Sequence, residues 1–132
     1  MATLPSGVGM DASLNYVDLP TNTWIIDWTS KQVRGMDAGM AAMRQAVEIT
    51  LSIERFWWQI YNSNFGAELD GLPGREEAYI ESELPRRIRD AFSVDNRILS
   101  VENFAFSRSG AALTVSFDVI TVYGTVPGEV TI

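Results

Sequence analysis

The segment that most constrains the fold runs from Asp37 to Gly66, where a helical pattern continues without a breaker into an aromatic run. Asp37 is suited to accept the unpaired N–H bonds of a helix start, and apolar residues recur around it at helical spacing. This stripe consists of Met36, Met40, Met43, Val47 and Leu51. The alternation from Phe56 to Tyr61 predicts a strand that packs on both faces. We therefore expect a core-facing helix that leads directly into an aromatic strand.

The same helix carries two further features. A second, weaker apolar stripe lies on roughly its opposite side, so both flanks require cover. Its members are Ala42, Ala46, Ile49 and Ile53. Glu54 projects along the first stripe by helical spacing, and an ionised carboxylate is costly there unless a cation or several donors meet it.

The composition indicates one globular domain. The chain has 132 residues, of which 46% are hydrophobic, and no apolar run is long enough to cross a bilayer. Its formal net charge of −7 disfavours nucleic-acid phosphates and anionic lipid surfaces. The only basic cluster is Arg86, Arg87 and Arg89, which reads as a helix C-terminal charge pattern or as a site for an acidic partner surface. We expect no nucleic-acid partner and no membrane association.

Two residue types are absent. Without cysteine there is no disulfide, thiolate nucleophile or Cys-ligated metal, and without histidine there is no Ser-His-Asp catalysis or ordinary zinc site. We expect no cofactor and no metal. The first twenty residues contain no Lys or Arg and no apolar segment, so they do not resemble a secretory signal, and we expect synthesis in the bacterial cytoplasm.

The chain divides into three parts by composition. Residues 1–22 form a polar, extended N-terminal arm, residues 23–126 a single core domain, and residues 127–132 a C-terminal tail. The arm is expected to lie across its own domain or to dock on a neighbouring subunit. The tail, with Val130 and Ile132, suits strand addition to another sheet.

Within the core domain, Trp24 to Trp28 predicts a short strand, followed by a polar loop through Gly35. After the central helix and the aromatic strand comes a long turn-rich connection. Residues 76–92 predict a second helix, which either kinks at Pro85 or begins at Ser82. Its apolar positions are Ile80, Leu84, Ile88 and Phe92.

Two further strands, residues 97–107 and 111–122, form a hairpin around Ser109 and Gly110, with a bulge expected between Val101 and Phe104. The second alternates buried and wet residues and can extend to Val126 before Pro127 ends it. The buried positions are Leu113, Val115, Phe117 and Val119. The order β-α-β-α-β-β predicts an α+β fold, a small mostly antiparallel sheet covered by two helices.

Two chemical functions are alternatives to an interaction role. A carboxylate-based cell-wall glycan hydrolase would pair Glu54 with Glu68 or Asp70, but no motif sets their separation. A small ligand-binding domain would need a deep apolar pocket lined by Trp57 or Trp58. No catalytic group is distinctive enough to predict an enzyme.

Many short matches, in order and spacing, carry a resemblance to a known family. They are Gln45-Ala46-Val47, Glu54-Arg55-Phe56, residues 60–66, Glu68-Leu69, Arg86-Arg87-Ile88, Asp90-Ala91, Arg97-Ile98, residues 101–104 and residues 115–119. This succession, over about residues 24–124, resembles the baseplate wedge, sheath-initiator family of contractile phage tails. The likeness is to the branch found in defective prophages and phage-tail-like bacteriocins.

The resemblance implies a structural protein, in six copies around the tail tube, that links the baseplate wedge to the first sheath ring and shares strands with its neighbours. Its expected partners are the sheath protein and the wedge proteins, with the tube or hub as further candidates. Glu54 and Arg55 match the family's signature for holding a wedge protein, although Phe56-Trp57-Trp58 replaces the Arg-Pro pair of many members. The expected partner-binding residues are Glu54, Arg55, Trp57, Arg86, Arg87, Tyr123, Thr125, Val126 and Val130.

Overall fold

A computed structural model describes residues 22–132, so the arm predicted over residues 1–22 lies outside the described residues except for Asn22. The elements are β1 (Thr23–Asp27), β2 (Gln32–Asp37), α1 (Met40–Ser52), α2 (Glu77–Phe92), β3 (Ile98–Ser109), β4 (Ala112–Thr121) and β5 (Gly124–Thr131). The α+β class is confirmed. The predicted order is wrong in detail, because the structure has β-β-α-α-β-β-β.

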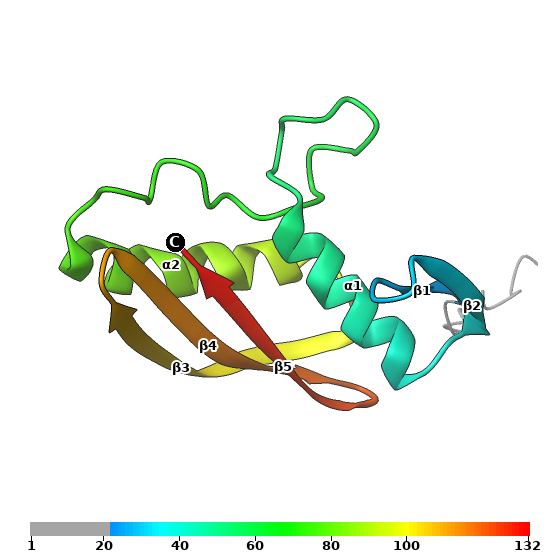
Figure 1. Cartoon of the computed structure of the whole chain (residues 1–132). Coiled ribbons are helices and arrows are strands. Elements are labelled where there is room, and N and C mark those ends of the chain that lie inside the picture. Colours follow the sequence, from blue (N-terminus) through cyan, green and yellow to red (C-terminus); the bar gives the residue numbers. More distant parts are fainter. Residues whose placement is uncertain (1–21) are drawn as a thin grey trace, which may run out of the picture.

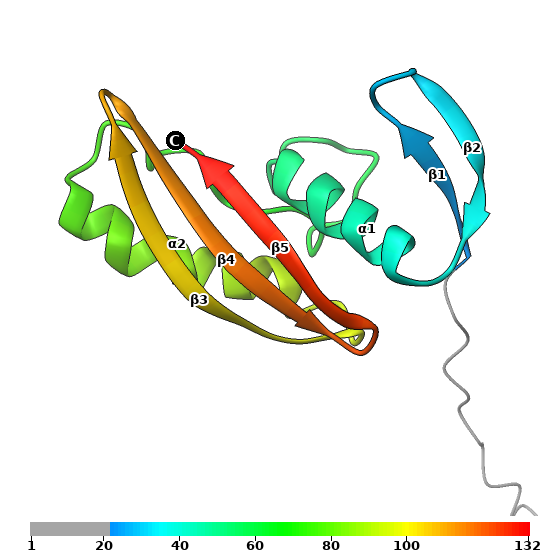
Figure 2. The same cartoon turned by 60° about the horizontal axis from the view of Figure 1, so that its bottom comes forward.

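The body of the molecule is an antiparallel sheet in the order β3-β4-β5 with α2 across one face (Figure 1). Figure 2 shows α1 beside the outer edge of β5, at an angle to the strands. Residues from both helices and all three strands bury one shared apolar cluster. The fully buried side chains of this cluster include Met43, Leu72, Leu84, Ile88, Val115, Val119 and Val126.

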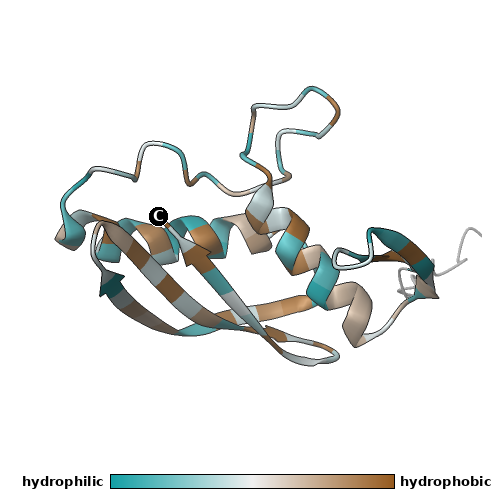
Figure 3. Ribbon diagram, viewed as in Figure 1, coloured by the Kyte–Doolittle hydropathy of each residue, from teal (hydrophilic) through white to brown (hydrophobic). Residues whose placement is uncertain are grey.

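The alternation predicted for the second strand of the hairpin is confirmed in β4. Its odd-numbered residues from Leu113 to Val119 are at most 5% exposed, while Ser116 is exposed. Figure 3 shows the resulting bands of apolar and polar colour along the strands of this sheet. The predicted bulge is also confirmed, because the register between β3 and β4 shifts between Glu102 and Ala105.

The C-terminal residues form a strand of their own. The prediction that the second strand runs on to Val126 and ends at Pro127 is wrong, because β4 ends at Thr121 and a two-residue turn leads into β5. β5 pairs with β4 along its whole length, and Ile132 still exchanges two backbone hydrogen bonds with Leu113. Pro127 is tolerated because β5 is an edge strand.

The second helix runs through its proline. α2 begins at Glu77, so the alternative start at Ser82 is wrong, and Pro85 lies in the helix interior. The predicted apolar positions of this helix are all buried. The carbonyl of Glu81, four residues before Pro85, loses its helical donor. Glu81 is exposed, so water can replace that donor.

The first helix begins later than predicted. α1 has Gly39 as its N-cap residue, and Asp37 instead ends β2, where its carboxylate accepts a 2.9 Å bond from the Gly39 N–H. Met43 and Val47 are buried as the stripe predicts. Met36 does not belong to this stripe, because it lies on β2 and is 50% exposed.

The expected polar loop before α1 is instead half of a hairpin. β1 pairs with β2 as a separate two-stranded sheet that projects beyond the N-terminal end of α1 (Figure 2). The Gln45 side chain of α1 holds its edge, accepting a 2.8 Å bond from the Ile26 N–H and donating a 2.8 Å bond to the Trp24 carbonyl. The Gln45 side-chain amide thus makes hydrogen bonds to the edge of β1 that a third strand would otherwise make.

The predicted aromatic strand is wrong. Residues 56–66 form a projecting loop, visible above the end of α1 in Figure 1, and Phe56 has a φ of 71°. The alternation of aromatic residues reflected neither a sheet nor two packed faces.

Candidate functional site

The loop of residues 56–66, called the aromatic loop below, is closed at its base by backbone pairing. The Arg55 N–H donates to the Ala67 carbonyl at 3.1 Å, and the Ala67 N–H donates to the Ile53 carbonyl at 3.0 Å. Gly66 makes this crossing possible, because it has a φ of 102° and a Cβ there would lie 2.6 Å from the Ile53 oxygen. The two ends of the loop therefore meet in a fixed, closely packed base.

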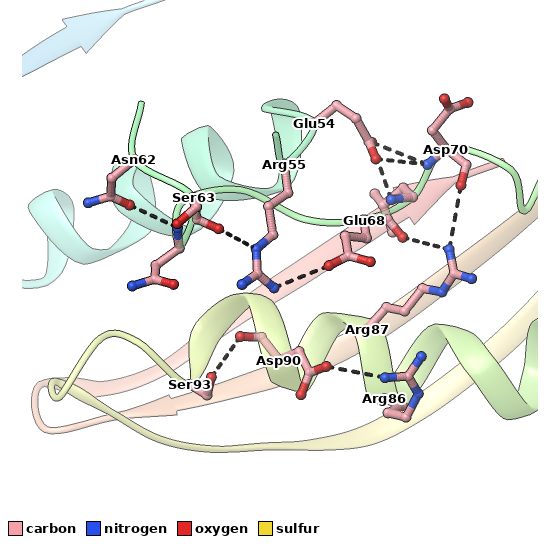
Figure 4. A network of polar contacts seen from close by, with 12 residues as sticks. Glu54, Arg55, Asn62, Ser63, Glu68, Asp70, Arg86, Arg87, Asp90 and Ser93 are labelled. Atoms are coloured by element: carbon pink, nitrogen blue, oxygen red, sulfur yellow. Dashed lines mark hydrogen bonds and ion pairs between the residues drawn. The ribbon is translucent and has the colours of Figure 1, made fainter. Parts of the chain in front are cut away.

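Glu54 is used inside the chain. Its carboxylate accepts backbone N–H bonds at 3.2 Å from Leu69 and Asp70 (Figure 4). The prediction that Glu54 lies on the apolar stripe of the helix is wrong, because α1 ends at Ser52 and Glu54 forms a bridge with Ala67. Its carboxylate is nevertheless met by several donors. Backbone donors to a charged acceptor are among the stronger hydrogen bonds in proteins. Glu54 thus fixes the start of the connection to α2.

Arg55 holds the other side of the same base. Its Nε donates to the Ser63 carbonyl at 2.7 Å, and Nη1 lies 3.2 Å from Oε1 of Glu68. The guanidinium also lies 4.8 Å from the centroid of the Phe56 ring. Because its charged, planar guanidinium group makes several contacts at once, Arg55 holds both halves of the aromatic loop at its base.

Arg87 connects this base to α2. Its Nη1 donates to the carbonyls of Glu68 at 3.0 Å and Asp70 at 3.4 Å, while Nε lies 3.3 Å from Glu83. Hydrogen bonds from Arg86 and Arg87 lower the pKa of the Glu83 carboxyl. Arg86 is exposed and also pairs with Asp90 at 3.3 Å. Of the two predicted arginines, only Arg86 lies on the open surface.

The aromatic loop exposes large apolar side chains. Phe56 is 64% exposed, Trp57 66%, Trp58 57% and Ile60 84%. No charged residue occurs between Phe56 and Ala67. Trp57 and Trp58 are each more than half exposed, which differs from the enclosed apolar pocket that the ligand-binding alternative requires. Clustered exposed aromatic residues on a rigid base are typical of a protein-interaction site.

A second candidate site is a groove of about 520 Å³ along the free edge of β5, walled by α1. Val126 and Val130 line it from the strand, and Val47 and Leu51 line it from the helix. Arg44 and Glu48 lie at its helical rim. Of the other predicted partner-binding residues, Thr125 is exposed on β5 and Tyr123 is 37% exposed in the turn before it.

The carboxylate of Glu54 accepts two backbone N–H bonds, and the described residues include no cluster of three acidic, cysteine or histidine side chains that could hold a metal ion. In this part of the chain, no helix combines the length and apolar character required to cross a bilayer.

Sequence reasoning missed the two outer residues of β5 at the groove and, elsewhere in the fold, the contact of Gln45 with β1 and the strand β2. Gln45 is a polar residue on the helix whose role at the edge of β1 leaves no sequence signal. Glu129 and Thr131 lie at the outer edge of β5, which was expected to be a free tail. The alternation from Gln32 to Met36 could have indicated β2, but Gly35 obscured it.

Comparison with known proteins gives two consistent matches. The family model described as contractile injection system sheath initiator matches residues 18–124, which confirms the resemblance drawn from the sequence. The phage-like element PBSX protein XkdS of Bacillus subtilis (strain 168) is 38% identical over 113 residues, or 83% of this chain and 80% of that protein. The chain therefore belongs to the contractile injection system sheath initiator family, and is a structural component of a contractile tail.

Proposed function

We propose that this chain links the baseplate wedge to the first sheath ring and starts sheath assembly by accepting a strand from a sheath subunit along β5. The observation that carries this proposal is the groove between α1 and the free edge of β5. An extended peptide can add to such an edge, gaining affinity from backbone bonds and specificity from alternate side chains. The role of β5 is then to receive a strand, since its own residues are paired with β4.

The backbone N–H and C=O groups of β5 point alternately toward β4 and outward, and the outward groups are those that an added strand could bind. Ile132 and Leu113 exchange two bonds, at 2.8 and 2.9 Å, so the even-numbered residues of β5 point their backbone groups toward β4. The odd-numbered residues point theirs outward. Outward N–H groups are available at Thr125, Glu129 and Thr131, whereas Pro127 has none. An added strand would therefore bind in two blocks, one on each side of Pro127.

The opposite edge of the sheet is less suited to this role. The outward carbonyl of Val101 on β3 already accepts a 3.4 Å bond from Nε of Arg89. A bulge follows between Glu102 and Ala105, and bulges twist an edge away from further pairing. These features favour β5 as the acceptor.

The aromatic loop supplies the proposed contact with the wedge. Trp57, Trp58 and Ile60 would bury their exposed surface there, while Glu54, Arg55 and Arg87 hold the loop in shape. Pre-organisation of this kind reduces the entropy lost on binding. The exposed Arg86, which pairs with Glu83 and Asp90 within the chain, would also pair with an acidic group on the wedge or sheath.

The remaining parts of the proposal follow the family. Six copies would surround the tail tube, with sheath and wedge proteins as partners and the tube or hub as further candidates. The chain would act without enzymatic activity, cofactor, nucleic acid or membrane, after synthesis in the bacterial cytoplasm. Support for these parts comes from membership of a structural family.

The strand-acceptor role is tested by Glu129→Pro. This change removes an outward N–H without touching the bonds between β5 and β4, so the chain should fold with little change in melting temperature. Electron microscopy of particles assembled with the variant should show few sheathed tails. Glu129→Ala is the matched control, because it removes the same carboxylate and keeps the N–H, and it should give normal sheaths. Normal sheaths with Glu129→Pro would rule out the outer edge of β5 as the acceptor.

A further inference from the structure

The outer edge of β5 has the features of a strand edge that could pair with the same edge of another copy. β5 is eight residues long, and the N–H groups of Thr125, Glu129 and Thr131 point outward along it. Val126 and Val130 line an apolar groove beside this edge. An exposed edge next to apolar surface is a template for pairing with any other chain, including a second copy.

Two other strand edges in the described part of the chain are blocked by contacts within it. The Gln45 side chain bonds to the backbone of Trp24 and Ile26 along β1. On β3, Nε of Arg89 bonds to the Val101 carbonyl, and a bulge follows. The edge of β5 has a proline instead, because its fourth residue is Pro127.

Pro127 removes a donor from every extensive pairing of two β5 edges. In an antiparallel pair of copies, outward residues of one strand oppose outward residues of the other. These are Thr125, Pro127, Glu129 and Thr131 in each copy. Any register that aligns three or more of them includes Pro127 of both copies, so two hydrogen bonds are missing. A strand of another protein that has all its own N–H groups loses only one.

The charge of the chain is a weaker obstacle to this pairing. Each copy has a formal net charge of −7, which opposes the approach of a second copy. Salt at physiological concentration screens such repulsion beyond about 8 Å. The missing donor, in contrast, leaves a carbonyl of the opposing strand without a partner inside the contact, and salt does not remove that cost.

We infer that Pro127 prevents two copies of this chain from pairing through β5 and so keeps this edge available for a strand of a different protein. The inference rests on the proposed strand-acceptor role, because an edge that receives a partner during assembly has to remain unpaired until then. Pro127 is thereby a specificity-determining residue, which disfavours a pair of copies by two hydrogen bonds and a foreign strand by one.

The inference is tested by Pro127→Thr in the purified full chain. This change supplies the missing outward N–H and leaves the bonds between β5 and β4 intact. The dissociation constant for self-association, measured by sedimentation velocity, should fall by about 30-fold relative to wild type, because two hydrogen bonds are regained. Pro73→Thr, the same change in an exposed connection, is the matched control and should sediment like wild type. Unchanged self-association of Pro127→Thr would overturn the inference.

Moving the proline along the edge locates the contact. Adding Glu129→Pro to Pro127→Thr removes another outward N–H that every extensive register uses, so self-association should return to the wild-type level. Adding Glu129→Ala instead keeps that N–H and should leave the stronger self-association in place. Hydrogen exchange at Thr125 and Thr131 should slow with concentration in Pro127→Thr alone. Self-association that survives the moved proline would show that the edge of β5 is not the contact.

Sheath assembly separates this inference from the function on which it rests. If Pro127→Thr self-associates while the single change Glu129→Pro gives normal sheaths, Pro127 blocks pairing between copies but β5 is not the acceptor. If Pro127→Thr behaves like wild type in solution while Glu129→Pro abolishes sheaths, β5 is the acceptor and the inference about Pro127 is wrong.

Discussion

The body of the molecule and its two projections contain the same kinds of residues in opposite environments. In the body, Phe92 and Phe117 are each 2% exposed. In the projections, the β1–β2 hairpin and the aromatic loop, large apolar side chains such as Phe56 and Trp24 are more than half exposed. Burial thus divides the large apolar residues of this chain into two groups. Those in the body supply folding energy, and those in the projections are available for binding.

The largest expected effect compares two phenylalanines. Phe117→Ala should lower the free energy of unfolding by about 3–5 kcal/mol, because it leaves a cavity beneath the sheet and removes the contact with Phe104. Phe56→Ala should change it by less than about 1 kcal/mol, because that ring is largely in water. Urea denaturation of both variants measures this. Equal losses would show that the aromatic loop is part of the folding core.

The next effect concerns the glycine at the base of the aromatic loop. Gly66→Ala should cost about 2–3 kcal/mol, because the new Cβ meets the Ile53 carbonyl and the backbone has a positive φ. Gly71→Ala also has a positive φ but has open space around it, so it should cost about 1 kcal/mol. Thermal unfolding of the pair distinguishes crowding from backbone strain, and a smaller loss at Gly66 would contradict the close crossing.

A smaller effect is expected at Glu54. Glu54→Gln keeps one acceptor oxygen but removes the charge that strengthens the bonds to Leu69 and Asp70, so it should cost about 1 kcal/mol. Hydrogen exchange at these two amides should accelerate, while exchange in β4 stays slow. Glu129→Gln, on the exposed edge of β5, is the control and should leave both amides protected.

The smallest effect is a dependence on pH. Hydrogen bonds from Arg97 lower the pKa of the Asp95 carboxyl below its ordinary value of 3.8. This stabilisation is complete above pH 3.8 and is lost as the pH falls through the lowered pKa of the folded state. Partial exposure limits it to less than about 1 kcal/mol. Arg97→Gln should reduce the acid dependence of the unfolding free energy, and an unchanged dependence would contradict the pairing.

The sequence predicted the body better than the projections for a physical reason. Apolar and polar residues alternate in β4, and apolar residues recur at helical spacing in α2, because one face of each element is buried. These patterns therefore indicate the packing directly. From Phe56 to Tyr61 the same alternation corresponds to no strand, because the positive φ of Phe56 and the pairing of Arg55 with Ala67 close the segment into a loop. The backbone pairing of Glu54 with Ala67 depends on Gly66, thirteen residues from Ile53, and no local pattern encodes it.

The bonds of Arg87 have a mechanical consequence. This one side chain joins α2 to the connection that follows the aromatic loop, and the bridge between Glu54 and Ala67 joins the same connection to the end of α1. A tensile load applied to the loop is therefore divided between two helices that share one apolar interior. Several hydrogen bonds must break together before the loop can be pulled away from the body of the molecule. This suits a structural component that must hold its position while a contractile tail shortens.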